Sequence, residues 1–409
     1  MKKSYMSYLL IIMTLLLTAC GGNEKKSDGP TELTVGTWST TPEETKMLQK
    51  QFAAFEKANP GVKVNHRVYV NNYEQNIQTD YAAGIAPDVF YVDIASTANY
   101  VDKKVIAPLD EYLTEETTSL HDKVAINGFK GADGKLYGLP KDCATLVLFH
   151  NEDYFKAAGI EKAPVTWDEL VEVSKKLIAA KDAGKLPKEF VHPMSVIFDG
   201  VRVAPFIYSN GGDMVKDGSV DLTSDETKEA MEFYYSLVRD GYADIPQNQG
   251  TASLVSSFAE GKSAMIMSGT WAEAFFQRAT PDLNYDKSML PYSKEPSTMF
   301  LSVAFAVNSQ TSKKAEAADF VKFITGVEGQ SILIENEHAL PTVMSLKNDF
   351  LEKYPHKQAF IDSMEYATPW NWGTATIRMS TEMKLYGEKA VMDSNISVDG
   401  IAQEITNKF

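Results

Sequence analysis

The sequence predicts an α/β protein, and three observations lead to that fold class. Short strand-like runs alternate with amphipathic helical segments from Leu33 onward. Several of the predicted helices end at a glycine or a proline, which are common helix stop signals. The chain has 409 residues, of which 44% are hydrophobic, so it is long enough for two to three domain-sized units with a large core.

The predicted elements follow one another closely along the chain. Leu48, Phe52 and Phe55 recur at helical spacing, and Thr166 with Glu169 forms a capping box that starts another helix. Strands are expected at residues 33–36, 62–70, 88–92 and 265–267. Helices are expected at residues 43–58, 72–83, 225–240 and 313–325. Alternation of this kind favours mostly parallel sheets.

Charge and composition exclude several classes of protein. Lys and Arg total 40 against 55 Asp and Glu, for a formal net charge of −15. Such a field repels nucleic acid and anionic membrane surfaces. Two cysteines are too few for a disulfide scaffold or a cysteine-rich zinc site, and no two of the six histidines are four residues apart. We therefore expect no metal and no cofactor.

The first 19 residues are typical of an export signal. Lys2 and Lys3 precede an apolar run at residues 9–17, which is shorter than the roughly 20 residues needed to span a bilayer. The following Leu17-Thr18-Ala19-Cys20 resembles a bacterial lipobox, which implies cleavage before Cys20 and a diacylglyceryl group on its sulfur. Residues 20–30 are polar and are typical of a flexible tether. An ordinary signal peptide with a chance cysteine is the alternative. Cys143 then has no partner in its own chain, and we expect it to be a small buried hydrophobe.

Catalytic signatures are missing from the chain. No G-x-S-x-G elbow and no G-x-G-x-x-G turn after a strand is present. Gly261-Lys262-Ser263 imitates the end of a phosphate loop, but it follows a predicted helix, so we interpret it as a turn into a strand. We expect a protein that is not an enzyme, although the sequence leaves open a pair of carboxylates placed as in a glycosidase.

Several short motifs occur in a characteristic order along the chain. They are YAAGIAPDV at 81–89, KLYGLP at 135–140, LVLFHN at 146–151, PVTWDEL at 164–170, FAEGKSAM at 258–265, SGTW at 268–271, AEAADF at 315–320 and LPT at 340–342. This order resembles the family 1 extracellular solute-binding proteins of ABC importers, the maltose-binding-protein-like group. The resemblance covers essentially the whole chain after the signal segment. One departure is residues 299–302, where many relatives have a glycine-rich turn.

The resemblance implies a two-lobed periplasmic-binding-protein fold, type II-like, with a ligand cleft between the lobes. Lobe one is expected at 31–142 and 303–338, and lobe two at 146–297 and 343–409. The chain is expected to cross between them near 143–145, 298–302 and 339–342. Short crossings suit a hinge, because few residues have to absorb the rotation.

The resemblance also implies a function. The protein is expected to capture a carbohydrate, an oligosaccharide above all, by lobe closure and to deliver it to the permease subunits of an ABC importer. It is expected to be a monomer held by Cys20 at the extracytoplasmic face of the cell membrane, with no nucleic-acid partner. Alternatives are a binding protein for a charged small solute (a polyamine or an organic phosphate), a surface glycoside hydrolase and an adhesive lipoprotein.

Sugar recognition needs aromatic planes for the C–H face and polar groups for the hydroxyl rim. Trp271 is the leading candidate, because it follows the strand at 265–267 through a Ser-Gly turn and matches a stacking position of the family. Its alternative is a place in the core of lobe two. Trp38 follows the first strand, and Trp370 and Trp372 lie in a polar loop, whereas Trp167 beside a helix cap is expected to pack.

Polar candidates complete the predicted site. Asp93 either accepts hydroxyl protons or caps a helix that begins near Ala95. Asp142, at the first crossing, either binds ligand or pins the hinge. Tyr73, together with Gln75, faces either the cleft or the surface. Arg378 and Arg202 either hold a hydroxyl or an acidic sugar, or form structural ion pairs.

Replacing Cys20 with alanine should prevent lipid attachment, because the thiol is the acceptor in the predicted lipobox. The protein should then leave the membrane fraction for the medium or remain unprocessed. Fractionation followed by mass spectrometry of the N-terminus measures this. A processed Cys20→Ala protein that stays in the membrane fraction would contradict lipid anchoring.

Overall fold

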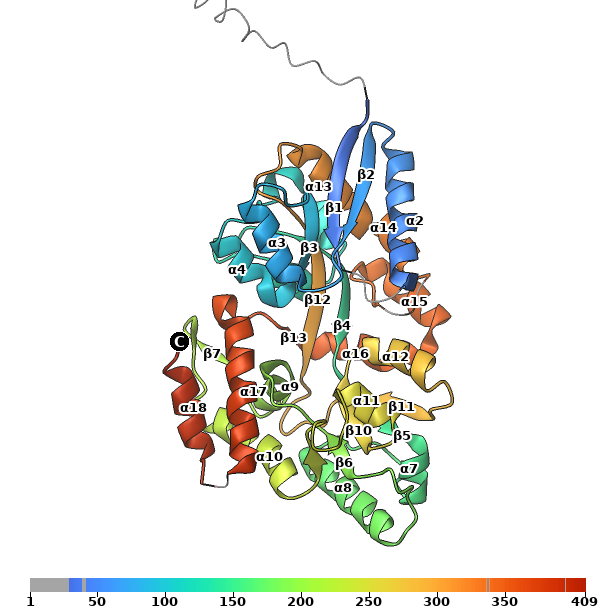
Figure 1. Cartoon of the computed structure of the whole chain (residues 1–409), viewed down its shortest axis with the longest axis vertical. Helices are drawn as coiled ribbons and strands as arrows, with labels where there is room; N and C mark the ends of the chain where they lie inside the picture. The colour runs from blue at the N-terminus through green and yellow to red at the C-terminus, as the bar shows by residue number, and fades with distance from the viewer. Residues whose placement is uncertain (1–28, 39–41, 336, 338, 394) are drawn as a thin grey trace, which may run out of the picture.

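A computed structural model of the chain describes residues 29–409 except 39–41, 336, 338 and 394 (Figure 1). The predicted signal peptide, Cys20 and all but the last two residues of the predicted tether lie outside the described residues. No helix in the described part of the chain is long and apolar enough to cross a bilayer.

The first sheet has six strands and is mixed in direction. Its order is β13-β12-β3-β1-β2, and β4 also pairs with β12. The strands are β1 (Thr31–Thr37), β2 (Val62–Val68), β3 (Val89–Asp93), β4 (Leu139–Thr145), β12 (Thr298–Val307) and β13 (Ala367–Pro369). β1 runs parallel to β2 and β3, whereas β12 runs antiparallel to β3 and β4.

The second sheet has five strands in the order β11-β5-β10-β6-β9. They are β5 (Val147–Asn151), β6 (His192–Ser195), β9 (Ala243–Asp244), β10 (Ser263–Ser268) and β11 (Tyr285–Ser288), and a separate hairpin joins β7 (Val215–Lys216) to β8 (Ser219–Val220). β10 is parallel to β6 but antiparallel to β5. Parallel and antiparallel pairings are about equally common in the two sheets, so the prediction of mostly parallel sheets is confirmed only in part.

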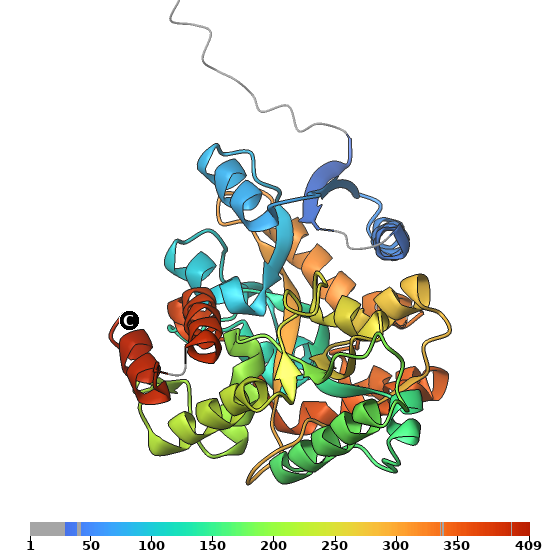
Figure 2. The same ribbon diagram turned by 60° about the horizontal axis from the view of Figure 1, so that its bottom comes forward.

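Helices cover both sheets, and the two halves of the molecule are seen above and below the middle of Figure 1. Around the first sheet lie α2 (Pro42–Ala58), α3 (Tyr73–Ala82), α4 (Thr97–Asp102), α5 (Glu115–Ser119), α6 (Lys123–Gly128), α13 (Lys314–Thr325) and α14 (Val327–Leu333). Around the second sheet and the middle lie α7 (Glu152–Ala157), α8 (Trp167–Asp182), α9 (Gly200–Ser209), α10 (Asp225–Arg239), α11 (Leu254–Ala259), α12 (Trp271–Ala279), α15 (Lys347–Lys353), α16 (Gln358–Ser363), α17 (Thr376–Met392) and α18 (Val398–Thr406). Figure 2 brings the helices of the lower half forward.

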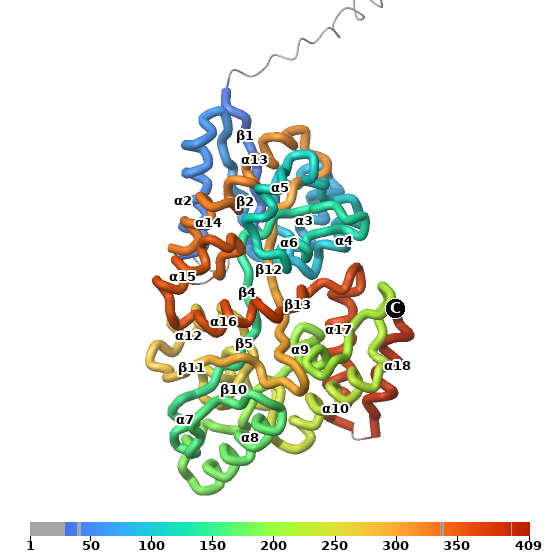
Figure 3. The backbone as a smooth tube through the Cα atoms, turned by 180° about the vertical axis from the view of Figure 1, so that it is seen from behind, coloured from blue at the N-terminus to red at the C-terminus, as the bar shows by residue number. Residues whose placement is uncertain are grey.

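The predicted crossing segments lie side by side. Cys143 pairs with Ser302 in the β4–β12 ladder. The backbone N–H of Cys143 donates to the Leu340 carbonyl at 3.0 Å, and the Leu340 N–H donates back at 3.2 Å. Figure 3 shows β4 and β12 running from one half of the molecule to the other. The Cys143 thiol is buried, as its sequence context predicts.

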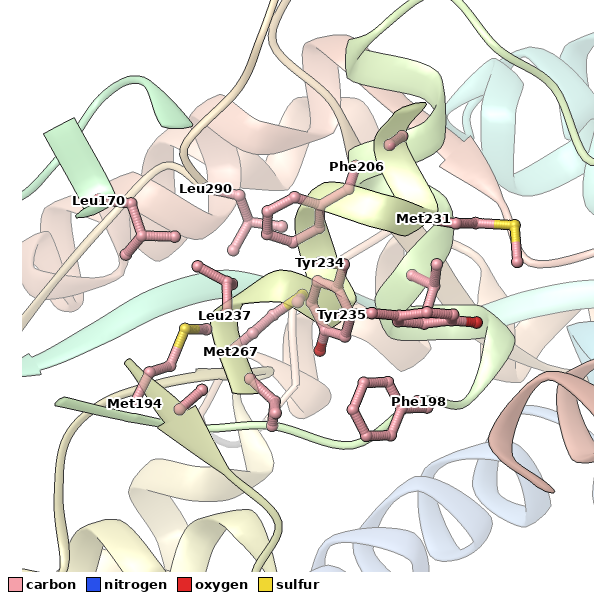
Figure 4. Close-up of a cluster of buried hydrophobic side chains, with 14 of the residues drawn as sticks. Leu170, Met194, Phe198, Phe206, Met231, Tyr234, Tyr235, Leu237, Met267 and Leu290 are labelled. Atoms are coloured by element: carbon pink, nitrogen blue, oxygen red, sulfur yellow. The ribbon is translucent and has the colours of Figure 1, made fainter. Parts of the chain in front are cut away.

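Strand alternation sends neighbouring residues into different cores. In β10, Met265 and Met267 pack into one buried cluster, whereas Ile266 packs into another. β5 alternates in the same way, with Leu148 on one side and Phe149 on the other. A strand that is apolar at every position is expected where both faces of a sheet are covered. Figure 4 shows one of these clusters, in which side chains from α9, α10 and the second sheet meet.

The structure confirms two local features predicted from the sequence, a helix cap and a glycine turn. The Thr166 hydroxyl accepts the Glu169 N–H and the Glu169 carboxylate accepts the Thr166 N–H, which is the predicted capping box at the start of α8. The predicted turn at Gly261 joins α11 to β10, and Gly261 has a positive φ of 72°. Glycine reaches that conformation without the steric cost that a side chain imposes.

Candidate functional site

A cavity of about 740 Å³ lies between elements of the first and second sheets. That volume is within the range of small-molecule sites, which is roughly 300–1,000 Å³. The first sheet and its helices contribute one wall, with Glu44, Asp93, Lys141 and Asp142. The second sheet and its helices contribute the other wall. Among its residues are Ile197, Arg202, Leu254, Val255, Trp271, Phe275 and Arg278. The two walls therefore differ in chemistry.

Trp271 lines the cavity from the first residue of α12, directly after β10 and its Ser-Gly turn. Its side chain is 40% exposed, which makes it one of the large apolar side chains left open to solvent. The indole folds back over Gly269, where an added Cβ would lie 2.1 Å from the ring. Glycine at 269 is thus required by the close approach of the ring. The position agrees with the predicted cleft and not with the alternative place in the core.

Phe275 extends the aromatic surface one helical turn beyond Trp271. Residues four apart on a helix share a face, so both rings of α12 line the cavity. The Arg278 guanidinium lies 5.9 Å from the centre of the Phe275 ring and also lines the cavity. Sequence analysis missed Phe275 and Arg278, although their spacing from Trp271 is the signal that would have found them.

Asp93 ends β3, where it fulfils the capping role considered for it and also lines the cavity. Its Oδ1 accepts the Ala95 N–H at 2.9 Å and so caps a short 3₁₀ turn, η1 (Ile94–Ser96), while its side chain lines the cavity. Burial, together with the nearby carboxylates of Glu74 and Asp142, raises the pKa of Asp93 to about 7 in spite of the opposing effect of the Ala95 hydrogen bond. Near neutral pH this group can donate or accept a hydrogen bond.

Asp142 lies on β4 and is paired with the preceding lysine. The Lys141 ammonium, which is buried, contacts the Asp142 carboxylate and lies 4.8 Å from the centre of the Tyr91 ring. Burial raises the pKa of Asp142, and the adjacent Lys141 charge opposes that rise. Both residues line the cavity, so the pair offers an acceptor and a donor to a bound molecule. Sequence analysis missed Lys141.

Arg202 also lines the cavity, and one nitrogen of its guanidinium is already engaged in an ion pair. Nη1 donates to Asp199 Oδ2 at 2.7 Å, which is the structural ion pair considered for it. Its Nε is buried and has no hydrogen-bond partner in the described part of the chain. A buried donor without a partner is costly, so the position of this guanidinium is set at some cost in stability.

Two of the other predicted aromatic residues lie behind the cavity wall instead of in it. Trp38 packs edge-on against Tyr73 and Tyr91, with ring centres 4.8 Å and 4.9 Å apart. The Tyr73 hydroxyl donates to the Tyr91 carbonyl at 3.0 Å, so it braces β3 from within. Neither residue is among those lining the cavity.

The loop after β13 differs most from its prediction. Trp372 is buried in the core beside α9, where its Nε1–H donates to the Tyr208 hydroxyl at 2.8 Å. Gly200 makes room for the ring, since an added Cβ would lie 2.9 Å from it. The polar residues of this loop form hydrogen bonds with its backbone; the Thr376 hydroxyl, for example, accepts the Trp372 N–H. A polar loop sequence therefore did not mean that Trp372 is exposed to solvent. Trp370 is partly buried against the cores of both halves.

The remaining predicted positions serve structural purposes. Arg378 is exposed on α17, with its guanidinium 4.6 Å from the centre of the Phe409 ring, and it does not line the cavity. Trp167 stacks on Phe233 at 4.3 Å between ring centres, which confirms its predicted packing role. Among the described residues no group of three or more His, Cys, Asp or Glu is arranged to hold a metal ion.

Two sheets are joined by paired crossing strands, and the cavity between them has aromatic and arginine side chains on one wall and carboxylates with a lysine on the other. This arrangement defines an α/β binding protein with an interdomain site. The sequence profile of the bacterial extracellular solute-binding proteins matches residues 50–376. The chain belongs to that family, which confirms both the resemblance and the fold class expected from the sequence.

Individual relatives cover most of the chain. The galactooligosaccharide-binding protein of Bacillus subtilis (strain 168) is 29% identical over 367 residues, covering 85% of this chain and 82% of the relative. The arabinooligosaccharide-binding protein of the same strain is 27% identical over 349 residues, covering 80% and 77%. An ABC substrate-binding protein from Listeria monocytogenes, solved in complex with cycloalternan, superimposes with a TM-score of 0.78 at 24% identity, covering 93% of this chain and 98% of that one.

The raised pKa of Asp93 should make stability depend on pH. Between the ordinary value of 3.8 and about 7, the folded state binds a proton that the unfolded state has released. The stability that Asp93 contributes relative to asparagine should therefore be greatest below pH 4, fall as pH rises to 7 and then level off. Each pKa unit corresponds to about 1.4 kcal/mol. Because the side chain is only partly buried, a total near 2 kcal/mol is expected.

Urea unfolding of the wild-type protein and the Asp93→Asn variant at pH 4, 5.5, 7 and 8 measures the difference. Asparagine can still accept the Ala95 N–H, so the cap is retained as a matched feature. A difference between the two proteins that does not change with pH would contradict the assignment.

Proposed function

We propose that the protein captures a neutral oligosaccharide outside the cytoplasm and delivers it to the permease of an ABC importer. The observation that carries this proposal is the half-exposed Trp271 indole, which faces carboxylates across a cavity in a member of this family. The two relatives named for oligosaccharides span most of the chain and support the solute class.

The chemistry of the two walls suits a sugar. The C–H face of a pyranose packs on an aromatic plane, and Trp271 with Phe275 offers such a surface. The hydroxyl rim needs both donors and acceptors, which Asp93, Asp142 and Lys141 offer from the opposite wall. Arg202 adds a guanidinium group from the second wall. A ligand that contacts both walls would hold the two halves together, which is how closure would be coupled to binding.

We propose binding without hydrolysis. A glycosidase needs one carboxylic acid and one free carboxylate on either side of the bond to be cut. Asp142 is paired with Lys141, and Asp93 is held in its cap by the Ala95 N–H, so both are positioned by the fold for hydrogen bonding. The same cavity would therefore bind the sugar and release it unchanged.

The proposed place of action follows from the N-terminal segment. Lipid on Cys20 and the polar residues that follow would hold the protein as a monomer near the outer face of the membrane, within reach of the permease. The acidic body would remain in solution, because the net charge of −15 is repelled by anionic lipid headgroups.

A ligand panel tests the proposed function. Galactotriose, arabinotriose, maltotriose, spermidine and glycerol 3-phosphate are each titrated by calorimetry and thermal shift. A neutral oligosaccharide at 100 times its Kd should stabilise the folded state by about 2.7 kcal/mol, reduce the radius of gyration in X-ray scattering and show no new reducing ends. Binding of spermidine or glycerol 3-phosphate alone would replace the proposal with a charged solute.

Two tryptophans on the same half of the molecule provide a matched pair for testing contact with the sugar. Trp271→Ala should weaken binding by roughly 30-fold, the effect of losing about 2 kcal/mol at a binding hot spot, with little change in Tm. Trp167→Ala should instead lower Tm by removing its stacking on Phe233 and leave affinity unchanged. Unaltered affinity in a folded Trp271→Ala protein would end the stacking role.

A further inference from the structure

A buried carboxylate lies two residues beyond Trp271. Glu273 is 1% exposed, and each of its carboxylate oxygens contacts a lysine ammonium. Oε1 is 2.9 Å from Lys287 Nζ on β11. Oε2 contacts Lys357 Nζ at the end of a 3₁₀ turn, η4 (Pro355–Lys357), and Lys357 is completely buried. We call Glu273, Lys287 and Lys357 the buried charge triad.

The start of α12 has backbone hydrogen bonds from Ala272 to Gly269 and from Glu273 to Thr270, but no side-chain cap. Thr270 occupies the N-cap position but makes no side-chain hydrogen bond to the helix. The indole of Trp271 fills the space above Gly269, because a Cβ at residue 269 would lie only 2.1 Å from the ring. A small movement of the first turn would therefore carry the ring across the cavity or into the Ser-Gly turn. Within this turn Ala272 packs in the core, and Glu273 is the buried residue that can add a charged contact.

The buried charge triad provides such contacts from two directions. Lys287 belongs to the edge strand of the second sheet, and Lys357 belongs to the segment that leads into α16. Two contacts to separate elements fix both the position and the rotation of a short helix. A buried ion pair adds little net stability compared with apolar residues of similar size. The main effect of the buried charge triad is therefore on the position of α12 and not on the free energy of unfolding.

We propose that Glu273 is a positioning residue for Trp271: it anchors the first turn of α12 to Lys287 and Lys357 and thereby sets the pose of the indole toward a bound sugar. The part concerning the sugar rests on the proposed function. The part concerning the pose of the indole does not, because it can be measured in the ligand-free protein.

The pose is tested with 5-fluorotryptophan and ¹⁹F NMR. The chain has five tryptophans, and the signal lost in Trp271→Ala identifies residue 271. In Glu273→Gln the signal of Trp271 should shift or broaden, while the signals of Trp38 and Trp167 stay in place. Glu382→Gln is the matched control, because it breaks the ion pair between Glu382 on α17 and Lys408 after α18 and leaves α12 untouched.

A second variant keeps the test decisive if Glu273→Gln leaves two buried lysines unpaired and does not fold. Lys357→Met retains the balanced pair of Glu273 with Lys287 and detaches α12 from η4 only. It should move the Trp271 signal in the same direction by a smaller amount. An unmoved Trp271 signal in a folded Glu273→Gln or Lys357→Met protein would overturn the proposal.

A double-mutant cycle then separates positioning from general destabilisation. Affinity is measured for galactotriose, or for the panel sugar that raises Tm most. Glu273→Gln should weaken binding about three- to tenfold in the wild-type background and have no effect in the Trp271→Ala background. Equal effects in both backgrounds would overturn positioning through Trp271. Loss of the effect of Trp271→Ala itself would count against the proposed contact and leave the NMR result standing.

Discussion

The antiparallel pairing of β4 with β12 is the contact on which the rest of the structure depends. Each strand carries the chain between the two sheets, and their ladder runs from Phe300 opposite Thr145 to Phe305 opposite Leu139. The segment predicted as the third crossing, at 339–342, is held against β4 by the reciprocal hydrogen bonds of Cys143 and Leu340. Because the cavity adjoins this ladder, any change in the angle between the sheets changes the distance between its aromatic and charged walls.

Much of this arrangement could be predicted from local signals. Helix caps, glycine stops and strand alternation depend on neighbours in sequence, so the elements at residues 43–58, 225–240 and 313–325 were placed within about two residues of their ends. Trp271 and Asp93 were found for a related reason. Asp93 ends a buried strand and Trp271 follows one through a short turn, and residues at the carboxyl ends of strands in α/β sheets face the ligand side.

The rest of the site depends on contacts between distant segments. Lys141 and Glu44 come from different elements of the first half, and nothing in their local sequence indicates that both face α12. The burial of Trp372 was missed because its hydrogen-bond partner, Tyr208, is 164 residues away. Trp38 follows a strand as Trp271 does, but neighbouring tyrosines cover its ring. A position at the end of a strand therefore predicts a cavity-lining side chain only when the neighbouring elements leave that side chain uncovered.

The alternation of β5 and β10 between two cores has a consequence for folding. Phe149 and Phe276 from the second half share one apolar cluster with Phe300, Phe350 and Phe360. If the chain were divided at its crossings, this cluster would be cut, and each fragment would expose part of its interior to water. The two halves are thus separated by the cavity on one side and share an apolar cluster on the other. We therefore expect the two halves to unfold together as one cooperative unit despite the two sheets.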